Sequence, residues 1–192
     1  RSGDAPPANG YGMLAFPASP AVDAVMLEAR AADFSKRSLK REAKRAAIDL
    51  AIRCIDLTTL EGRDTPGRVR SLCAKALRPG GDAPPVAAVC LYPNLVAVAK
   101  RALAGSGVKV ASVATAFPSG LSSLDVKLRD VETALAAGAD EIDMVIDRGA
   151  FLAGDERRVF DEIAAVKLLC GDVHVKAILE AGELGSYEAV RR

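Results

Sequence analysis

The feature that most constrains the fold of this chain is a repeated alternation of short apolar segments with longer amphipathic ones. Short apolar segments are typical of buried parallel strands, and the longer segments have the apolar spacing of helices. Five strands are predicted, at residues 55–59, 86–92, 108–117, 141–146 and 173–179, and a helix is predicted after each of them. Strands that alternate with helices predict an α/β fold with a parallel sheet and right-handed crossovers.

Two architectures contain such repeats, an open doubly wound sheet and a (β/α)₈ TIM barrel. No glycine-rich turn follows the first strand, which counts against the dinucleotide-binding form of the open sheet. A complete barrel takes about 250 residues, whereas the five units here use roughly 140. We therefore expect about the first five βα units of a barrel, with the chain stopping at Arg192 before the barrel would close.

The segment before the first strand differs from the repeats. Residues 1 to about 19 are rich in Gly, Pro, Ala and Ser and are predicted to form a mobile arm, and helices are predicted at 20–34 and 38–54. The second helix has an apolar stripe, which predicts packing, and a basic face, which is more often solvated than bound to an acidic partner. The stripe consists of Leu39, Ala43, Ala46, Ala47 and Leu50, and the basic face of Lys40, Arg41, Lys44 and Arg45. We divide the chain into an N-terminal arm and helix, 1–34, and a partial barrel domain, 35–192.

The predicted fourth strand carries a carboxylate in its interior. Its residues alternate so that Ile142, Met144 and Ile146 share an apolar face, while Asp143 lies on the opposite face with Glu141 and Val145. A carboxylate among apolar residues is expensive to bury unless it is paired or hydrogen-bonded. Asp143 is therefore either part of a structural network or a proton-transfer group in a site, and the strand alone does not separate the two.

Polar side chains recur in the other predicted strands, in the middle or at the C-terminal end, where barrels keep their sites. They are Asp56, Thr58, Cys90, Thr115, His174 and Lys176. Buried charges converge where they compensate one another, so Asp56, Asp143 and Lys176 are expected to meet. Lys176 is either a structural ion-pair partner or an amine whose pKa is lowered for chemistry. Cys90 is most simply a small core residue, and His174 an exposed or structural one.

Composition excludes several classes of function. The formal net charge is +1 and aromatic residues make up only 4%, so neither nucleic acid nor an anionic membrane is expected as a partner. No apolar run is long enough to span a bilayer. The four cysteines are scattered and there is one histidine, which argues against a metal site and indicates a reducing, cytoplasmic location.

Five stretches of the sequence resemble the deoxyribose-phosphate aldolase family. They are IDLTTL at 55–60, AAVCLYP at 87–93, VASVATAFP at 110–118, GADEIDMVI at 138–146 and KAILEAGEL at 176–184. The likeness runs from about residue 35 to the end, and five ordered blocks at matching spacing are much more specific than any single motif. The N-terminal extension resembles that of the longer members of the family.

The resemblance implies a (β/α)₈ barrel and class I aldolase chemistry without a metal or other cofactor. The family cleaves 2-deoxy-D-ribose 5-phosphate, a small phosphorylated sugar of deoxyribonucleotide catabolism, to D-glyceraldehyde 3-phosphate and acetaldehyde through a lysine Schiff base. By this resemblance Asp143 is the catalytic carboxylate that moves protons, and Lys176 belongs to the same catalytic polar network. Residues that match the substrate-pocket lining are Asp56, Thr58, Cys90 and Phe117. Members of the family often associate as homodimers.

The sequence departs from the family in a respect that matters for activity. The family's Schiff-base lysine lies on the sixth strand in a Phe-Ile-Lys-Thr-Ser-Thr-Gly-Lys-like run, and a second lysine and the phosphate-binding glycine turns follow on strands seven and eight. None of these runs occurs in this sequence, so we expect the chain alone to lack aldolase activity. Two alternatives remain open: a non-catalytic aldolase-like interaction module, and a different lyase of the same fold in which Lys176 is the nucleophile.

Overall fold

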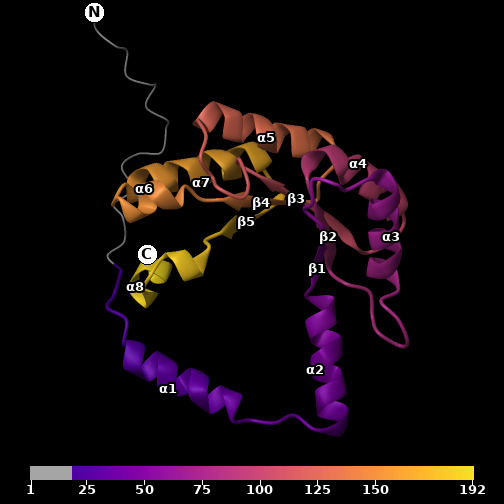
Figure 1. Ribbon diagram of the computed structural model, residues 1–192, viewed down its shortest axis with the longest axis horizontal. Helices are drawn as coiled ribbons and strands as arrows, with labels where there is room; N and C mark the ends of the chain where they lie inside the picture. The colour runs from indigo at the N-terminus through magenta and orange to yellow at the C-terminus, as the bar shows by residue number, and fades with distance from the viewer. Residues whose placement is uncertain (1–18) are drawn as a thin grey trace, which may run out of the picture.

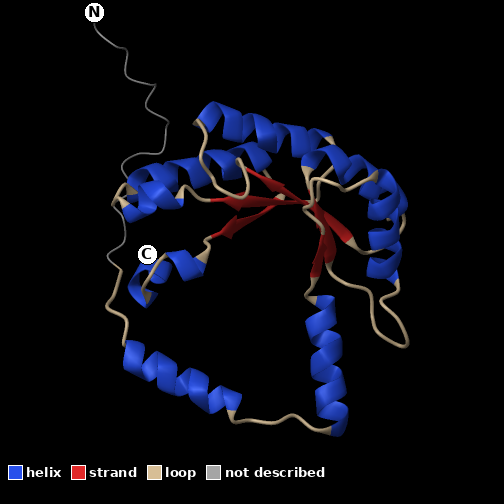
Figure 2. Ribbon diagram, in the orientation of Figure 1, coloured by secondary structure: helices blue, strands red, loops and turns tan. Residues whose placement is uncertain are grey.

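The computed structural model describes residues 19–192, which contain one five-stranded sheet (Figures 1 and 2). The strands are β1 (Asp56–Thr58), β2 (Ala88–Leu91), β3 (Lys109–Ala114), β4 (Glu141–Val145) and β5 (His174–Ile178). Every neighbouring pair is parallel, and the strands lie in chain order across the sheet. The predicted α/β fold with a parallel sheet is therefore confirmed.

Helices follow the strands, and several begin at capping residues that the sequence marks. The helix α3 (Pro66–Leu77) begins after Thr65, whose hydroxyl accepts a hydrogen bond from Arg68 N at 3.2 Å, and has proline in its first turn. The later helices are α4 (Pro93–Ala102), α5 (Leu124–Ala136), α6 (Arg148–Leu152), α7 (Glu156–Cys170), the 3₁₀-helix η1 (Ala181–Glu183) and α8 (Tyr187–Arg191). The sequence does not predict α6, because a helix of five residues is too short to establish a period.

The strand order distinguishes between the two architectures that the sequence leaves open. A doubly wound sheet reverses its strand order and carries helices on both faces, but here the order runs from β1 to β5 without reversal. In Figure 1 the helices α3, α4, α5 and α7 form an arc around one side of the sheet. On the other side Asp56 of β1 contacts Lys176 of β5, although a flat sheet would separate these strands by roughly 19 Å. The sheet is therefore curled with a concave inner face, as in part of a TIM barrel.

The main hydrophobic core lies between the convex face of the sheet and the helices around it. Ile142 and Met144 of β4 are at most 1% exposed and belong to this core, as the alternation in the fourth strand predicts. The helices contribute fully buried valines, namely Val69 of α3, Val96 of α4, Val131 of α5 and Val166 of α7. Because the apolar faces of the strands are used here, their other faces are left to form the concave surface.

One predicted strand extends too far. The third strand is predicted to reach Phe117, but β3 ends at Ala114, because Thr115 and Ala116 have φ angles of 63° and 58°, outside the extended region. Phe117 therefore projects from the loop after β3 and not from the strand itself. The helix predicted from residue 120 likewise begins later, at Leu124.

The N-terminal helices are α1 (Ala24–Ser35) and α2 (Arg41–Arg53), close to the predicted spans. The prediction that the apolar stripe of α2 packs against the domain is wrong, since Leu39 and Leu50 are 58% and 63% exposed. In Figure 1 α2 points away from the sheet, and its C-terminal end reaches the main core through Ile52. Amphipathic spacing identifies an apolar face but does not determine what covers it. The predicted arm lies almost wholly outside the described residues, and the domain division at residue 34 stays a prediction.

Candidate active site

The concave face of the sheet brings together charged residues from three strands. Asp143 and Lys176 are partners in the register of β4 and β5, so their side chains leave the sheet on the same face. Asp56 reaches the same place from β1 because the sheet curls, and its carboxylate contacts the Lys176 amine. The expectation that these three residues meet is confirmed.

Lys176 lies at the centre of this charged cluster. Its Nζ contacts the carboxylate of Asp56, Oε2 of Glu141 at 3.0 Å and Oδ1 of Asp143 at 3.0 Å. Burial alone would lower the pKa of Lys176, but hydrogen bonds to the three carboxylates outweigh it and hold the pKa above its usual value. The side chain is therefore an ammonium group at neutral pH, and an ammonium group has no free electron pair with which to attack a carbonyl carbon.

Asp143 is the most buried carboxylate of the cluster, with a side chain 12% exposed, against 22% for Glu141 and 29% for Asp56. Burial raises the pKa of Asp143 above its usual value, although Lys176 and Cys90 both act to lower it. Its Oδ2 accepts a hydrogen bond from Cys90 Sγ at 3.4 Å. Its Oδ1 is buried and lies 3.0 Å from Lys176 Nζ, so each of the two carboxylate oxygens faces a donor. A buried carboxylate with a raised pKa, held between a thiol and an ammonium group, is suited to proton transfer.

Cys90 lies beside Asp143 and is only 3% exposed. Burial, and secondly the negative charge of Asp143, raise the pKa of the Cys90 thiol to about 12. Since the thiolate is the reactive form of cysteine, Cys90 is a hydrogen-bond donor to Asp143 and not a nucleophile at neutral pH. Its small size also fits the concave face, as expected for a core residue.

Phe117 and Tyr92 form an aromatic wall next to the cluster. Their ring centroids are 6.2 Å apart and their planes are inclined at 66°, an edge-to-face arrangement. Both rings are half-buried and pack against a small apolar group made of Cys90, Ala111 and Val113. An apolar wall beside a buried carboxylate can exclude water and contact the carbon skeleton of a small substrate.

The remaining polar candidates lie outside the charged cluster. Thr58 is exposed, and its hydroxyl donates to the carbonyl oxygen of Asp56 at 2.8 Å. The hydroxyl of Thr115 is buried, donates to Val145 O at 2.9 Å and accepts from Val145 N at 2.8 Å, so it fastens the chain after β3 to β4. His174 is exposed at the start of β5, as expected. A role for Thr58 in substrate binding stays a prediction.

Glu141 is the member of the cluster that sequence reasoning did not single out as a site residue. It lies two residues before Asp143 and therefore on the same face of β4, so the period of the strand could have indicated it. Its contact with Lys176 depends on the neighbouring strand β5, which the spacing within β4 does not reveal.

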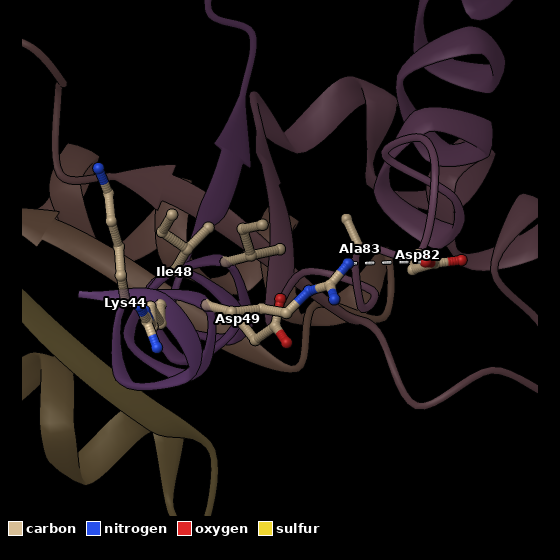
Figure 3. A pocket seen from close by; sticks show the side chains of 8 residues that line it. Lys44, Ile48, Asp49, Asp82 and Ala83 are labelled. Atoms are coloured by element: carbon tan, nitrogen blue, oxygen red, sulfur yellow. Dashed lines mark ion pairs between the residues drawn. The ribbon is translucent and has the colours of Figure 1, made fainter. Parts of the chain in front are cut away.

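A separate hollow of about 440 Å³ lies between α2 and the loop before β2 (Figure 3). Its walls include Lys44, Ile48 and an ion pair between Arg45 Nη2 and Asp82 Oδ2 at 3.8 Å. Figure 3 shows Lys44 extending away from Asp82, so the charged groups do not converge on one point. Because no set of reactive groups meets there, the concave face remains the candidate site.

The carboxylates of the charged cluster surround the ammonium group of Lys176. Throughout residues 19–192, no group of His, Cys, Asp and Glu is arranged to hold a metal ion. In the same part of the chain, no helix is both long enough and apolar enough to cross a membrane.

Comparisons with known proteins agree on one family. The model of the family described as DeoC/LacD family aldolase matches residues 50–186. The deoxyribose-phosphate aldolase of Bos taurus is 41% identical over 165 residues, which are 79% of this chain and 52% of that protein. A deoxyribose-phosphate aldolase structure from Coccidioides immitis matches with a TM-score of 0.68 at 31% identity. The matched region is 75% of this chain and 54% of the Coccidioides chain. The deoxyribose phosphate aldolase of Aeropyrum pernix, described as tetrameric, matches with a TM-score of 0.58 at 31% identity. The matched region is 70% of this chain and 54% of the Aeropyrum chain. The chain thus spans about half the length of these relatives.

Proposed function

The chain belongs to the DeoC/LacD aldolase family, and we propose that it supplies the first five βα units of a class I aldolase. The proposed reaction is the reversible cleavage of 2-deoxy-D-ribose 5-phosphate to D-glyceraldehyde 3-phosphate and acetaldehyde. The observation that carries the proposal is the buried Asp143, whose carboxylate lies between Cys90 Sγ and Lys176 Nζ on the concave face.

Asp143 is proposed to move protons during cleavage. Breaking the bond between C2 and C3 of the sugar requires removal of the C3 hydroxyl proton, and the two-carbon fragment must then gain a proton at C2. A carboxyl group whose pKa is raised by burial exchanges a proton more readily near neutral pH than an ordinary exposed Asp. The position of the carboxylate on the concave face, beside Cys90 and Lys176, supports a role in receiving that proton.

Lys176 is proposed to stay protonated and to balance the negative charge around Asp143. Schiff-base formation requires a neutral amine, whereas Asp56, Glu141 and Asp143 together favour the ammonium form. This argues against the lyase in which Lys176 is the nucleophile. The nucleophile of the proposed reaction is instead a sixth-strand lysine, which residues 1–192 do not include.

The other predicted site residues are proposed to border the substrate. Asp56 and Thr58 carry polar groups on β1 that suit sugar hydroxyls. Phe117 supplies an apolar surface beside Cys90. We also propose a cytoplasmic location, supported by the free thiols of the four cysteines. Assembly as a homodimer is proposed from the family resemblance, and light scattering on the purified protein tests it.

Borohydride trapping tests the proposed chemistry. The 192-residue chain and the whole coding sequence in which it occurs are each incubated with 2-deoxy-D-ribose 5-phosphate and sodium borohydride, and intact mass and peptide mapping locate any reduced adduct. We expect no adduct on the 192-residue chain, and an adduct on a lysine outside it from the whole coding sequence. An adduct on Lys176 would instead support the different lyase.

The role of Asp143 is tested in the same whole-length protein. Asp143→Asn is expected to slow cleavage by roughly 10²- to 10⁴-fold, the usual contribution of a general acid–base group, while the trapped adduct still forms. The matched control is Glu132→Gln, because Glu132 pairs with Arg129 on the surface of α5. If the whole-length protein neither cleaves the sugar nor forms an adduct, the interaction-module alternative replaces the aldolase.

A further inference from the structure

The loop after β3, residues 115–123, carries Phe117 and contacts the end of β4 and the residue that follows it. Near its start, the Thr115 hydroxyl donates to Val145 O at 2.9 Å and accepts from Val145 N at 2.8 Å. Further along, Gly120 has a φ of +70° and lies so close to Ile146, the residue after β4, that a Cβ there would be 2.5 Å from the carbonyl oxygen of Ile146. The loop is therefore hydrogen-bonded to β4 at its start and packs closely against the residue after β4 at Gly120, with Phe117 between the two contacts.

A third contact reaches the middle of the loop from the first residue of α6. Arg148 Nη1 donates to the carbonyl oxygen of Pro118, the residue after Phe117, at 3.3 Å. The same guanidinium donates through Nε to Oε2 of Glu183 in η1 at 2.6 Å. The Arg148 side chain is only 16% exposed, whereas that of Glu183 is 59% exposed. One side chain thus joins the loops that follow β3, β4 and β5.

We propose that Arg148 is a positioning residue, which holds the Phe117 loop and η1 together at the C-terminal ends of the strands and thereby fixes Phe117 as one wall of the substrate pocket. A guanidinium suits this role because its separate N–H groups can point at two acceptors at once. A lysine offers a single nitrogen, which cannot reach both acceptors in the same way. The clamp itself follows from the contacts, while its effect on substrate rests on the proposed function.

The clamp is expected to order the loops locally more than it stabilises the whole fold. A partly exposed ion pair contributes little to global stability, and a single hydrogen bond is worth roughly a factor of 2 to 10 in a local opening equilibrium. Arg148→Ala is therefore expected to leave the cooperative unfolding transition nearly unchanged while loosening residues 115–123 and 181–185.

Hydrogen–deuterium exchange on the 192-residue chain tests the clamp without any need for activity. In Arg148→Ala, peptides that cover 115–123 and 181–185 are expected to exchange roughly 2- to 10-fold faster. In Arg148→Lys, we expect the faster exchange in 115–123 alone, because the lysine keeps its pairing with Glu183 but loses Pro118. The matched control is Arg157→Ala, which removes a surface pair with Asp161 within α7 and should change neither segment.

Unchanged exchange of residues 115–123 in Arg148→Ala overturns the proposal. If that variant does not fold, Glu183→Ala takes its place, because alanine removes the acceptor of Arg148 Nε. Faster exchange of 181–185, with a smaller increase in 115–123, supports the clamp. No change in either segment refutes it. In the whole-length aldolase, Arg148→Ala should raise KM about 3- to 10-fold with kcat within about twofold. A loss of kcat at constant KM contradicts a positioning role for Phe117. Absence of aldolase activity in the unmutated protein contradicts the proposed function alone, since the exchange experiment still decides the clamp.

Discussion

A buried ion pair between α5 and α7 leads to an asymmetric prediction about stability. Lys127 Nζ lies 2.6 Å from Glu162 Oε2, and the two side chains are 1% and 6% exposed. Glu162 also has a second cation, since Arg158 Nε lies 3.5 Å from its Oε1. Removing Lys127 therefore leaves the carboxylate with Arg158, whereas removing Glu162 leaves the buried ammonium facing no carboxylate from α7.

The expected magnitudes follow from this difference. Leaving one partner of a buried ion pair without its counter-charge costs about 3–5 kcal/mol, which we expect for Glu162→Leu. Lys127→Met should cost less, about 2–3 kcal/mol, because Arg158 still compensates Glu162. The double variant Lys127→Met with Glu162→Leu places two apolar side chains together and should lie within about 1 kcal/mol of the unmutated chain or above it. For a chain of this length, 3–5 kcal/mol corresponds to a fall in Tm of roughly 6–20 °C.

Urea unfolding at pH 7, followed by circular dichroism, measures these differences in the free energy of unfolding. The surface pair Arg157 and Asp161, with side chains 45% and 48% exposed, serves as a control that should contribute at most about 1 kcal/mol. If Glu162→Leu costs no more than Asp161→Ala, or if Lys127→Met costs more than Glu162→Leu, the reasoning from burial and from the second cation is refuted.

Three further predictions concern the charged cluster and the cysteines. Asp143→Asn is expected to raise stability at pH 7, because burial raises the Asp143 pKa in the folded state. The protonated Asp143 therefore contributes its full stabilisation below the unfolded pKa of about 3.9, and this stabilisation is lost as pH rises through the folded pKa. In urea titrations the gain in the variant should shrink below about pH 4, and a gain that grows there would contradict the argument. Lys176→Met should lower stability at pH 7. Because the folded pKa of Lys176 is raised, the difference in stability from the unmutated chain should narrow as the pH rises above about 10.4. A difference that does not change above that pH would count against the three-carboxylate contact. When the chain is treated with iodoacetamide at pH 8, mass spectrometry should find the exposed Cys54 modified first. Cys90, whose pKa is about 12, should react only when the chain unfolds around it. Early labelling of Cys90 would refute its assignment as a buried thiol.

The faces of the strands could be predicted because they depend on local spacing. Alternation within 141–146 identified Asp143 as the interior carboxylate opposite an apolar face, and the structure buries Ile142 and Met144 accordingly. The same reasoning did not locate Phe117, because the loss of extended geometry at Thr115 and Ala116 is a property of two backbone angles that hydrophobic spacing does not encode. The apolar stripe of α2 is predicted to be covered but is largely exposed, because helical spacing does not specify a partner.

The parallel α/β class and the order of the βα units could be read from periodicity alone. Asp56, Asp143 and Lys176 could be identified as charges that need one another because burying an unpaired charge is costly. How these charges are combined depends on the three-dimensional fold. Asp56 and Lys176 are 120 residues apart and lie on the two edge strands, and they touch because the sheet curls. The curl arises from the twist and packing of all five strands together, whereas the contact of Glu141 with Lys176 depends on the pairing of β4 with β5.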